Sequence, residues 1–241
     1  MALRTTAPVR RVLGIDDIRA IEAQPYDDLV SAHTLYDLLR ATAQHHGDRK
    51  ALTVLRTPDP ADVGLSLTHA DLLAEVTRAA NMFRALGLAP GQGVAAFLSP
   101  TLPEFPALLL GAQVAGVAST INYLLSAEAV ADLLNAEAAT ILVIPAAHLD
   151  QMCWEKAQRL ADQVPSLRHI LVIGADGPLP HPMQPLGPLL ADHGAKALDF
   201  DVTATRDTVC ALFHTGGTTG RPKLVPLTHG NQIHAAFGFA Q

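Results

Sequence analysis

Residues 94–121 read VAAFLSPTLPEFPALLLGAQVAGVASTI, and their pattern decides the fold class. The stretch begins and ends with short apolar runs of the length of a buried strand, and an apolar segment long enough for a helix lies between them. Similar runs follow later in the chain. The expected strands are 94–98, 117–121, 140–144 and 169–173, and the expected helices between them are 102–115, 127–136 and 147–163. This alternation predicts an α/β fold, with a parallel-rich, doubly wound sheet and helices on both faces.

The same stretch has to be weighed as a membrane span, because 23 uncharged residues separate Glu104 from Glu128. A helix that crosses a bilayer needs about 20 apolar residues. Pro106, Gly116 and Asn122 interrupt this one, and its second half has the composition of a buried strand. We therefore expect no transmembrane segment.

Before this stretch the sequence predicts short helices and a hairpin. Thr34 can N-cap a helix over 35–46, and Thr68 can N-cap a helix over 69–86 that Gly87 ends. Two strand-like runs flank a turn-rich segment, which indicates a hairpin with a long loop. The remaining expected elements are a helix over 16–22 and hairpin strands over 51–56 and 65–67.

Past the last of the central strands the sequence changes character. Residues 174–188 hold five prolines, which remove backbone donors and fix φ, so we expect an internal Pro/Gly-rich loop or a subdomain boundary. A buried strand is expected over 209–213 and a helix from about Thr228. The chain ends at Gln241 inside this expected helix, as a truncated domain would. We therefore expect residues 1–241 to be an incomplete N-terminal portion of a larger domain.

Composition and charge exclude several classes of protein. The chain has 241 residues, of which 49% are hydrophobic and 17% charged, which is typical of a globular protein and not of a disordered one. The formal net charge is −6, so no nucleic-acid partner is expected, because a duplex needs a basic face. Cys153 and Cys210 form no CxxC pair, and no signal sequence accompanies them, so we expect a cytoplasmic protein without a zinc knuckle or a disulfide framework.

Residues 213–223 read FHTGGTTGRPK and are the strongest chemical signal in the chain. Glycines let backbone amides turn inward, threonines add hydroxyl donors and the lysine adds a cation, so the segment can cradle a polyphosphate. It is not a Walker A loop, because Pro222 and Leu224 stand where that motif needs glycine and a hydroxyl residue. A hairpin turn without a ligand is the alternative. The candidate nucleotide-binding residues are Thr215, Gly216, Gly217, Thr218, Thr219, Gly220 and Lys223.

This segment closely resembles the phosphate loop of the adenylate-forming (AMP-binding) superfamily, whose common form is TSGTTGxPKGV. The chain has TGGTTGRPKLV, with Gly216 in place of the usual serine and Leu224 in place of the usual glycine. Three other segments resemble family motifs in the same order: LTHADL at 67–72, GAQVAGVASTIN at 111–122 and THGN at 228–231. Together they extend the resemblance from about residue 34 to the end of the chain.

The resemblance implies an acyl-CoA synthetase, or carboxylic/fatty acid–CoA ligase, that works with ATP, Mg²⁺ and coenzyme A. A small-molecule carboxylic acid attacks the α-phosphorus of ATP, which gives an acyl-adenylate and pyrophosphate, and the thiol of coenzyme A then displaces AMP. The seven candidate residues would hold the β- and γ-phosphates. Thr215 would also lie near the magnesium ion. The preference for fatty acids rests on the general appearance of GGTTGRPK and of INYLLSAEAV at 121–130.

Other parts of the family's site belong to later sequence, among them the ribose-binding aspartate, the acidic magnesium ligand and the C-terminal domain with its adenylation lysine. We therefore assign no catalytic residue within this chain. We expect the chain alone to be inactive, without carboxylate-dependent exchange between ATP and pyrophosphate. Two alternatives remain open: a noncatalytic truncated binding module, and an adenylating enzyme with a different acyl acceptor.

The eleven histidines suggest no metal site, because the sequence has no HExxH motif and the pairs lack the spacing of helical ligands. Solvated or capping roles are expected for His45, His46, His229 and His234. His214 either contacts a nucleotide or faces the neighbouring part of the sheet. Cys210 is expected to be a small buried residue in the strand that enters the loop.

Overall fold

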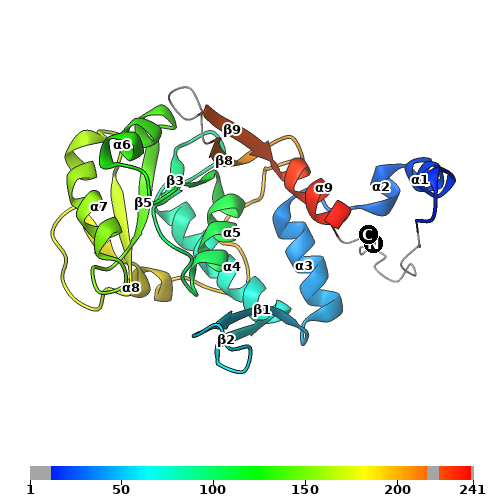
Figure 1. The fold of residues 1–241 in the computed structure, drawn as a ribbon, viewed down its shortest axis with the longest axis horizontal. Helices are drawn as coiled ribbons and strands as arrows, with labels where there is room; N and C mark the ends of the chain where they lie inside the picture. Colours follow the sequence, from blue (N-terminus) through cyan, green and yellow to red (C-terminus); the bar gives the residue numbers. More distant parts are fainter. Residues whose placement is uncertain (1–11, 216–222, 240–241) are drawn as a thin grey trace.

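The structure is a computed structural model that describes residues 12–215 and 223–239. Within these residues the chain forms an α/β fold whose main sheet has the strand order β7-β6-β5-β3-β4-β8-β9 (Figure 1). Neighbouring strands from β7 to β8 are parallel, and β9 runs antiparallel to β8. The predicted parallel-rich sheet is therefore confirmed. Its strands are β3 (Val94–Phe97), β4 (Ala118–Thr120), β5 (Ala139–Pro145), β6 (His169–Ile173), β7 (Met183–Pro185), β8 (Val209–Thr215) and β9 (Lys223–Thr228).

Helices cover both faces of this sheet, as predicted (Figure 1). In β5, Ile141 and Val143 pack toward α4 and α5, while Leu142 and Ile144 pack toward α6 and α7, because side chains alternate along a strand. All four side chains are fully buried, so the hydrophobic core lies on both sides of the central strands. The covering helices are α4 (His69–Ala85), α5 (Phe105–Ala115), α6 (Ala127–Ala136) and α7 (Gln151–Gln163).

The helices α4 and α5 approach each other closely at one glycine. A Cβ atom built on Gly111 of α5 would lie 2.5 Å from the Cβ atom of Ala79 in α4. Real Cβ atoms essentially never come this close, so the two backbones can pack at this distance because residue 111 has no side chain. The contact holds α5 in place directly before β4.

The elements before the sheet confirm the predicted caps and hairpin. Thr34 and Thr68 each accept a hydrogen bond from the backbone N–H of the aspartate three residues later, and that aspartate accepts one from the backbone N–H of the cap residue. β1 and β2 pair antiparallel in a separate small sheet. These elements are α1 (Ile15–Glu22), α2 (Tyr26–Leu29), α3 (Leu35–His46), β1 (Lys50–Leu55) and β2 (Val63–Thr68).

Two predicted helices begin later than the sequence pattern indicated. α5 begins at Phe105, and Pro106 occupies its first turn, where a missing N–H breaks no helical hydrogen bond. α7 begins at Gln151, because the Asp150 carboxylate accepts a hydrogen bond from the N–H of Cys153 at 2.8 Å and so caps the helix there. The predicted starts at 102 and 147 are therefore wrong, since apolar composition does not mark a helix boundary.

The proline-rich segment at 174–188 is more structured than an extended loop. Its residues Met183–Pro185 form β7, which pairs in parallel with β6 at the edge of the sheet, and α8 (Leu186–Ala191) follows directly. An edge strand makes ladder hydrogen bonds on one side, so it tolerates a proline. The prediction of a loop throughout this segment is wrong, and a subdomain boundary here stays a prediction.

The C-terminal elements return to the N-terminal segment. α9 (His229–Phe239) follows β9 and packs against α3, and Figure 1 shows both helices on the side of the molecule away from α6 and α7. The Arg206 guanidinium, which precedes β8, donates to the carbonyl oxygens of Ala32 and Val30 and forms an ion pair with Asp27. These contacts hold residues 27–32 against the start of the β8–β9 hairpin.

Candidate functional site

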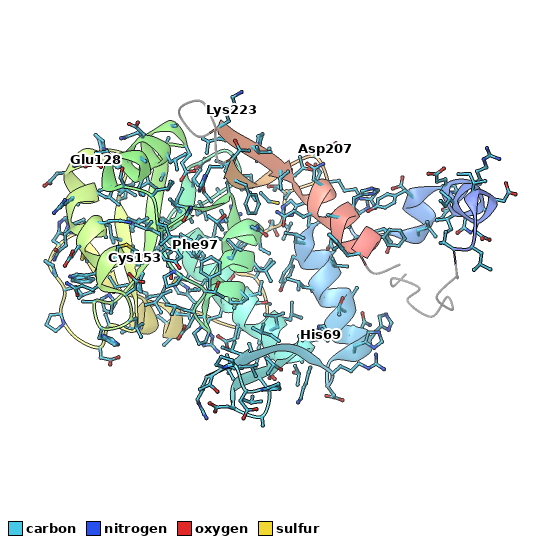
Figure 2. All side chains as sticks on the ribbon, viewed as in Figure 1. His69, Phe97, Glu128, Cys153, Asp207 and Lys223 are labelled. Atoms are coloured by element: carbon cyan, nitrogen blue, oxygen red, sulfur yellow. The ribbon has the colours of Figure 1, made fainter. Side chains whose placement is uncertain are left out.

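The phosphate-loop segment begins and ends on the β8–β9 hairpin. Thr215 is the last residue of β8 and Lys223 is the first residue of β9, and the two are paired in the antiparallel register. Both are exposed, and Figure 2 shows Lys223 at the end of β9 that points away from α9. The structure thus brings these two predicted residues together. The other predicted residues lie outside the described part of the chain: Gly216, Gly217, Thr218, Thr219 and Gly220.

This hairpin end lies at the carboxyl edge of the parallel strands. β8 is parallel to β4, and the chain leaves the carboxyl end of β4 into residues 121–126 beside the end of β8. β3 has β4 on one side and β5 on the other, so the direction of winding changes at β3. Open α/β sheets bind ligands at the carboxyl edge near such a change. The position of Thr215 and Lys223 therefore fits a ligand site.

A strand follows the loop segment directly. β9 pairs with β8 from Lys223 to Thr228. A Walker loop instead leads into a helix whose N-terminus faces the phosphates. At this hairpin a phosphate would be held by hydroxyls, backbone amides and the Lys223 cation. Pro226 lies in this edge strand, where it limits pairing with a further strand.

His214 connects the hairpin to the chain that leaves β4. Its Nε2 atom accepts a hydrogen bond from the backbone N–H of Asn122, with an N···N distance of 3.0 Å. Its Nδ1 atom is buried and has no hydrogen-bond partner among the described residues. Burial lowers the pKa of His214, which favours the neutral imidazole. Of the two roles left open by the sequence, the structure shows a contact within the fold, with the chain that follows β4 and not with a strand of the sheet, and a nucleotide contact stays a prediction.

The THGN segment at 228–231 builds a helix cap. The N–H and the hydroxyl of Thr228 donate to Oδ1 of Asn231, whose own N–H donates to the Thr228 hydroxyl. His229 is buried, and its Nδ1 atom accepts a hydrogen bond from the N–H of Leu35 at 3.3 Å, in the first turn of α3. Burial lowers the pKa of His229 to about 4, so the ring is neutral at pH 7. The expected capping role is confirmed for His229, and it is not solvated.

The sequence prediction missed a buried carboxylate. Glu137, directly after α6, is 7% exposed, and neither carboxylate oxygen has a hydrogen-bond partner among the described residues. Burial raises its pKa to about 7, opposed to a smaller extent by the nearby Ser119 hydroxyl of β4. A glutamate at a helix end is ordinarily solvated, so the sequence carried no signal that would have singled it out.

The donor set at the hairpin bears on metal binding. The described ranges contain no group of three or more His, Cys, Asp or Glu side chains that could hold one. Thr215 supplies a single hydroxyl, and Mg²⁺ commonly takes substrate phosphates and water for most of its six ligands. The hairpin residues that the structure describes therefore fit a magnesium ion that a polyphosphate would carry.

Comparisons with known proteins identify the family. The sequence profile described as "AMP-binding enzyme" matches residues 39–241. The chain belongs to the AMP-binding enzyme family. It is 29% identical to marinolic acid–CoA ligase from a Pseudoalteromonas species over 231 residues, which cover 93% of this chain and 34% of that protein. It is 34% identical to long-chain fatty acid transport protein 1 from Bos taurus over 214 residues, which cover 86% of this chain and 31% of that protein.

A solved structure shows the same fold. The crystal structure of an anthranilate CoA ligase in complex with anthranoyl-AMP superimposes with a TM-score of 0.71 at 22% identity, over 89% of this chain and 38% of that chain. The predicted membership in the adenylate-forming family and the predicted fold class are confirmed. The chain spans about a third of the length of the curated relatives it matches. No helix in the described residues has both the length and the apolar character needed to cross a membrane.

Proposed function

We propose that this chain of the AMP-binding enzyme family supplies the nucleotide-holding part of an AMP-forming acyl-CoA ligase. The observation that carries the proposal is the hairpin, in which the TGGTTGRPK segment starts at Thr215 and reaches Lys223, its cross-strand neighbour, at the carboxyl edge of the sheet. That arrangement supports a site for the triphosphate of ATP. The whole enzyme would join a carboxylic acid to coenzyme A through an acyl-adenylate.

The chemistry explains why a cation and hydroxyls are needed at this place. A carboxylate oxygen is a poor leaving group by itself. Once it has attacked the α-phosphorus and released pyrophosphate, it can leave as part of AMP when a thiol attacks the carbonyl carbon. Negative charge grows on the phosphate oxygens as pyrophosphate leaves, and donors that are already in place stabilise this charge. Lys223 and the Thr215 hydroxyl would hold the β- and γ-phosphates. Further donors on the same loop are proposed at Gly216, Gly217, Thr218, Thr219 and Gly220.

We propose that Mg²⁺ binds together with ATP. When bound, Mg²⁺ neutralises part of the charge on the triphosphate. Thr215 is the residue of this chain that we place beside it, because its exposed hydroxyl lies at the hairpin end. Coenzyme A is the proposed second substrate, and its binding residues are not assigned on this chain.

A fatty acid is the acyl substrate we propose. The names of the relatives refer to marinolic acid, long-chain fatty acids and anthranilate, which differ in shape and share a carboxylate. Activation of a carboxylate is therefore the common chemistry, and the similarity to the bovine fatty acid transport protein favours an aliphatic acid. The cytoplasmic location stays a prediction.

Two other functions are kept as alternatives. A noncatalytic module would bind a nucleotide through the same hairpin without turning it over, and an adenylating enzyme could pass the acyl group to an acceptor other than coenzyme A. We also propose that the 241-residue chain by itself does not catalyse exchange between ATP and pyrophosphate. Robust exchange by the purified chain with any carboxylic acid would contradict this part of the proposal.

Calorimetric titration of the chain with MgATP tests the nucleotide site. We expect saturable binding that Lys223→Ala weakens by about a hundredfold, because charge-assisted contacts to phosphate are among the strong ones. Lys196→Ala removes another exposed lysine, outside the hairpin, and is the matched control that should bind as the wild type does. Equal affinities for wild type and Lys223→Ala would refute the proposed site.

A further inference from the structure

The backbone ladder between β4 and β8 ends before the loop begins. β4 pairs with β8 at Ala118, Ser119 and Thr120, and the last partner on β8 is Phe213. Beyond Phe213, the final residues of β8 have a ladder partner on the β9 side, while β4 has already ended. The last two residues of β8, His214 and Thr215, are therefore held by strand pairing on the β9 side alone.

Where the β4–β8 ladder ends, the side chain of His214 makes the next contact between the two parts of the chain. The Nε2 atom of His214 accepts the N–H of Asn122, a residue 92 positions away in the sequence and two residues after the end of β4. The hydrogen bond joins the same two parts of the chain that the ladder joined one step earlier. It replaces the missing backbone contact on the β4 side.

Residues 122–124, which His214 contacts, are themselves held in place. Oδ1 of Asn122 accepts a hydrogen bond from the N–H of Leu124 at 3.0 Å, which closes a tight turn. The Lys156 ammonium of α7 donates to the carbonyl oxygen of Tyr123. Residues 122–124 therefore form a fixed platform against which His214 can position the end of β8.

The chemistry of the contact restricts which residue can make it. An acceptor at Nε2 requires the neutral imidazole with its proton on Nδ1. An aliphatic or phenyl side chain offers no acceptor, and the Asn122 N–H would then lose its partner. A glutamine carries an amide oxygen at a comparable distance from the backbone and can accept the same N–H.

From this geometry we infer that His214 is a positioning residue for the phosphate site: it anchors the end of β8 to residues 122–124 and so orients Thr215 toward the triphosphate. The inference rests on the proposed function, because it assigns a role in ATP binding. His214 is not itself one of the proposed phosphate donors, because it acts through the backbone of its neighbour Thr215.

The test compares MgATP affinities of four chains. We expect His214→Leu to weaken binding about tenfold, which corresponds to the loss of one hydrogen bond. His214→Gln should stay within about threefold of the wild type, because it restores an acceptor. His169→Leu is the matched control: His169 is also a half-buried strand histidine, hydrogen-bonded to Gln184 at 3.1 Å, but it lies on β6, away from the hairpin. It should bind MgATP as the wild type does.

Nuclear magnetic resonance of the same chains examines the contact directly. In the wild type the imidazole nitrogens of His214 should show the tautomer protonated on Nδ1. The Asn122 amide should exchange slowly with solvent in the wild type and in His214→Gln, and faster in His214→Leu. A role in fold stability alone would not produce this pattern together with a selective loss of MgATP affinity.

The outcomes separate this inference from the proposed function. If Lys223→Ala abolishes binding while His214→Leu binds MgATP as tightly as the wild type, the positioning role is overturned and the phosphate site stands. The role is also overturned if His214→Gln is as weak as His214→Leu, or if His169→Leu is equally weak. If the wild-type chain binds no MgATP, the proposed function and the positioning role both fail.

Discussion

The centre of the sheet and the β8–β9 hairpin differ in strand pairing and in the burial of their side chains. Each central strand, such as β5, has a neighbour on both sides and side chains buried on both faces. β9 has one neighbour, and Val225 in it is 37% exposed. Figure 2 shows Phe97 inside the molecule and Lys223 at its surface. This fold therefore places its stability in the centre and leaves polar groups available at the edge, where a ligand can reach them.

The strongest test of this difference is a cavity in the centre. Phe97→Ala removes a ring that is 1% exposed and packs edge-on against Phe83 and Phe105. We expect a loss of roughly 3–5 kcal/mol in the free energy of unfolding, because a large cavity opens in a closely packed core. Urea denaturation measures this loss.

The matched hairpin variant is Val225→Ala. Its side chain is already partly in water, so we expect a loss below about 1 kcal/mol. Equal losses at Phe97 and Val225 would show that the edge hairpin is as much a part of the core as β3, and the comparison would fail.

The buried carboxyl group of Glu137 should make the stability of the fold depend on pH. The pKa of Glu137 is raised by burial from 4.5 to about 7. Because the folded protein holds this proton more tightly than the unfolded chain, the contribution to stability is complete below pH 4.5, decreases as the pH rises to about 7, and is constant above that. The shift corresponds to roughly 3 kcal/mol. Denaturant unfolding of wild type and Glu137→Gln between pH 4 and 8 measures it.

The variant should lose this pH dependence, since glutamine has no proton to release. Glu155→Gln removes an exposed carboxylate of α7 and should leave the curve of the wild type unchanged. A parallel pH dependence in wild type and Glu137→Gln would show that Glu137 is hydrated in the folded protein.

Packing between helices gives a smaller effect. Gly111→Ala would place a Cβ atom 2.5 Å from that of Ala79, so α4 and α5 must move apart. We expect a loss of roughly 1–3 kcal/mol, as for other overpacked cores. The control is Gly187→Ala in α8, where an added Cβ meets nothing within 4 Å. Thermal unfolding that ranks the two variants the other way round would contradict the close approach of the helices.

The smallest change in stability is expected at the hairpin end itself. Thr215→Ala removes an exposed hydroxyl and should alter the free energy of unfolding by less than about 0.5 kcal/mol. Its MgATP affinity should nevertheless decrease about tenfold, the effect of one lost hydrogen bond to a charged group. Thermal unfolding and calorimetry on the same sample measure both quantities. A large loss of stability with unchanged affinity would reverse the assignment of stability to the centre and chemistry to the edge.

The parts of the fold that the sequence predicted are those with a strong local pattern. The strands β5 and β6 and the helix α6 were predicted to within a residue at either end, because continuous apolar runs and capping residues mark them. β7 was missed, since three residues among prolines carry no strand pattern and become a strand by pairing with β6. The starts of α5 and α7 were misplaced because prolines and a capping aspartate set them within apolar surroundings.

The same division holds for the site. Thr215 and Lys223 were proposed as phosphate donors from the composition of one short segment. The structure makes them neighbours across the hairpin, and phosphate binding stays a prediction. The contact between His214 and Asn122 could not be predicted, because it depends on the parallel placement of two strands 92 residues apart. The burial of Glu137 could not be predicted for a similar reason, since it depends on how α6 packs against β5 and brings Glu137 near Ser119 of β4.

The sequence by itself determined the α/β class and the family and indicated the proposed phosphate segment, because these follow from hydrophobic patterns and from the residue types within short segments. The tertiary structure decided which distant groups meet: Thr215 with Lys223 across the hairpin, His214 with the chain after β4, and His229 with the start of α3. Hydrogen bonds and desolvation act over a few ångströms, so their effects depend on distances in space that the order of residues does not contain.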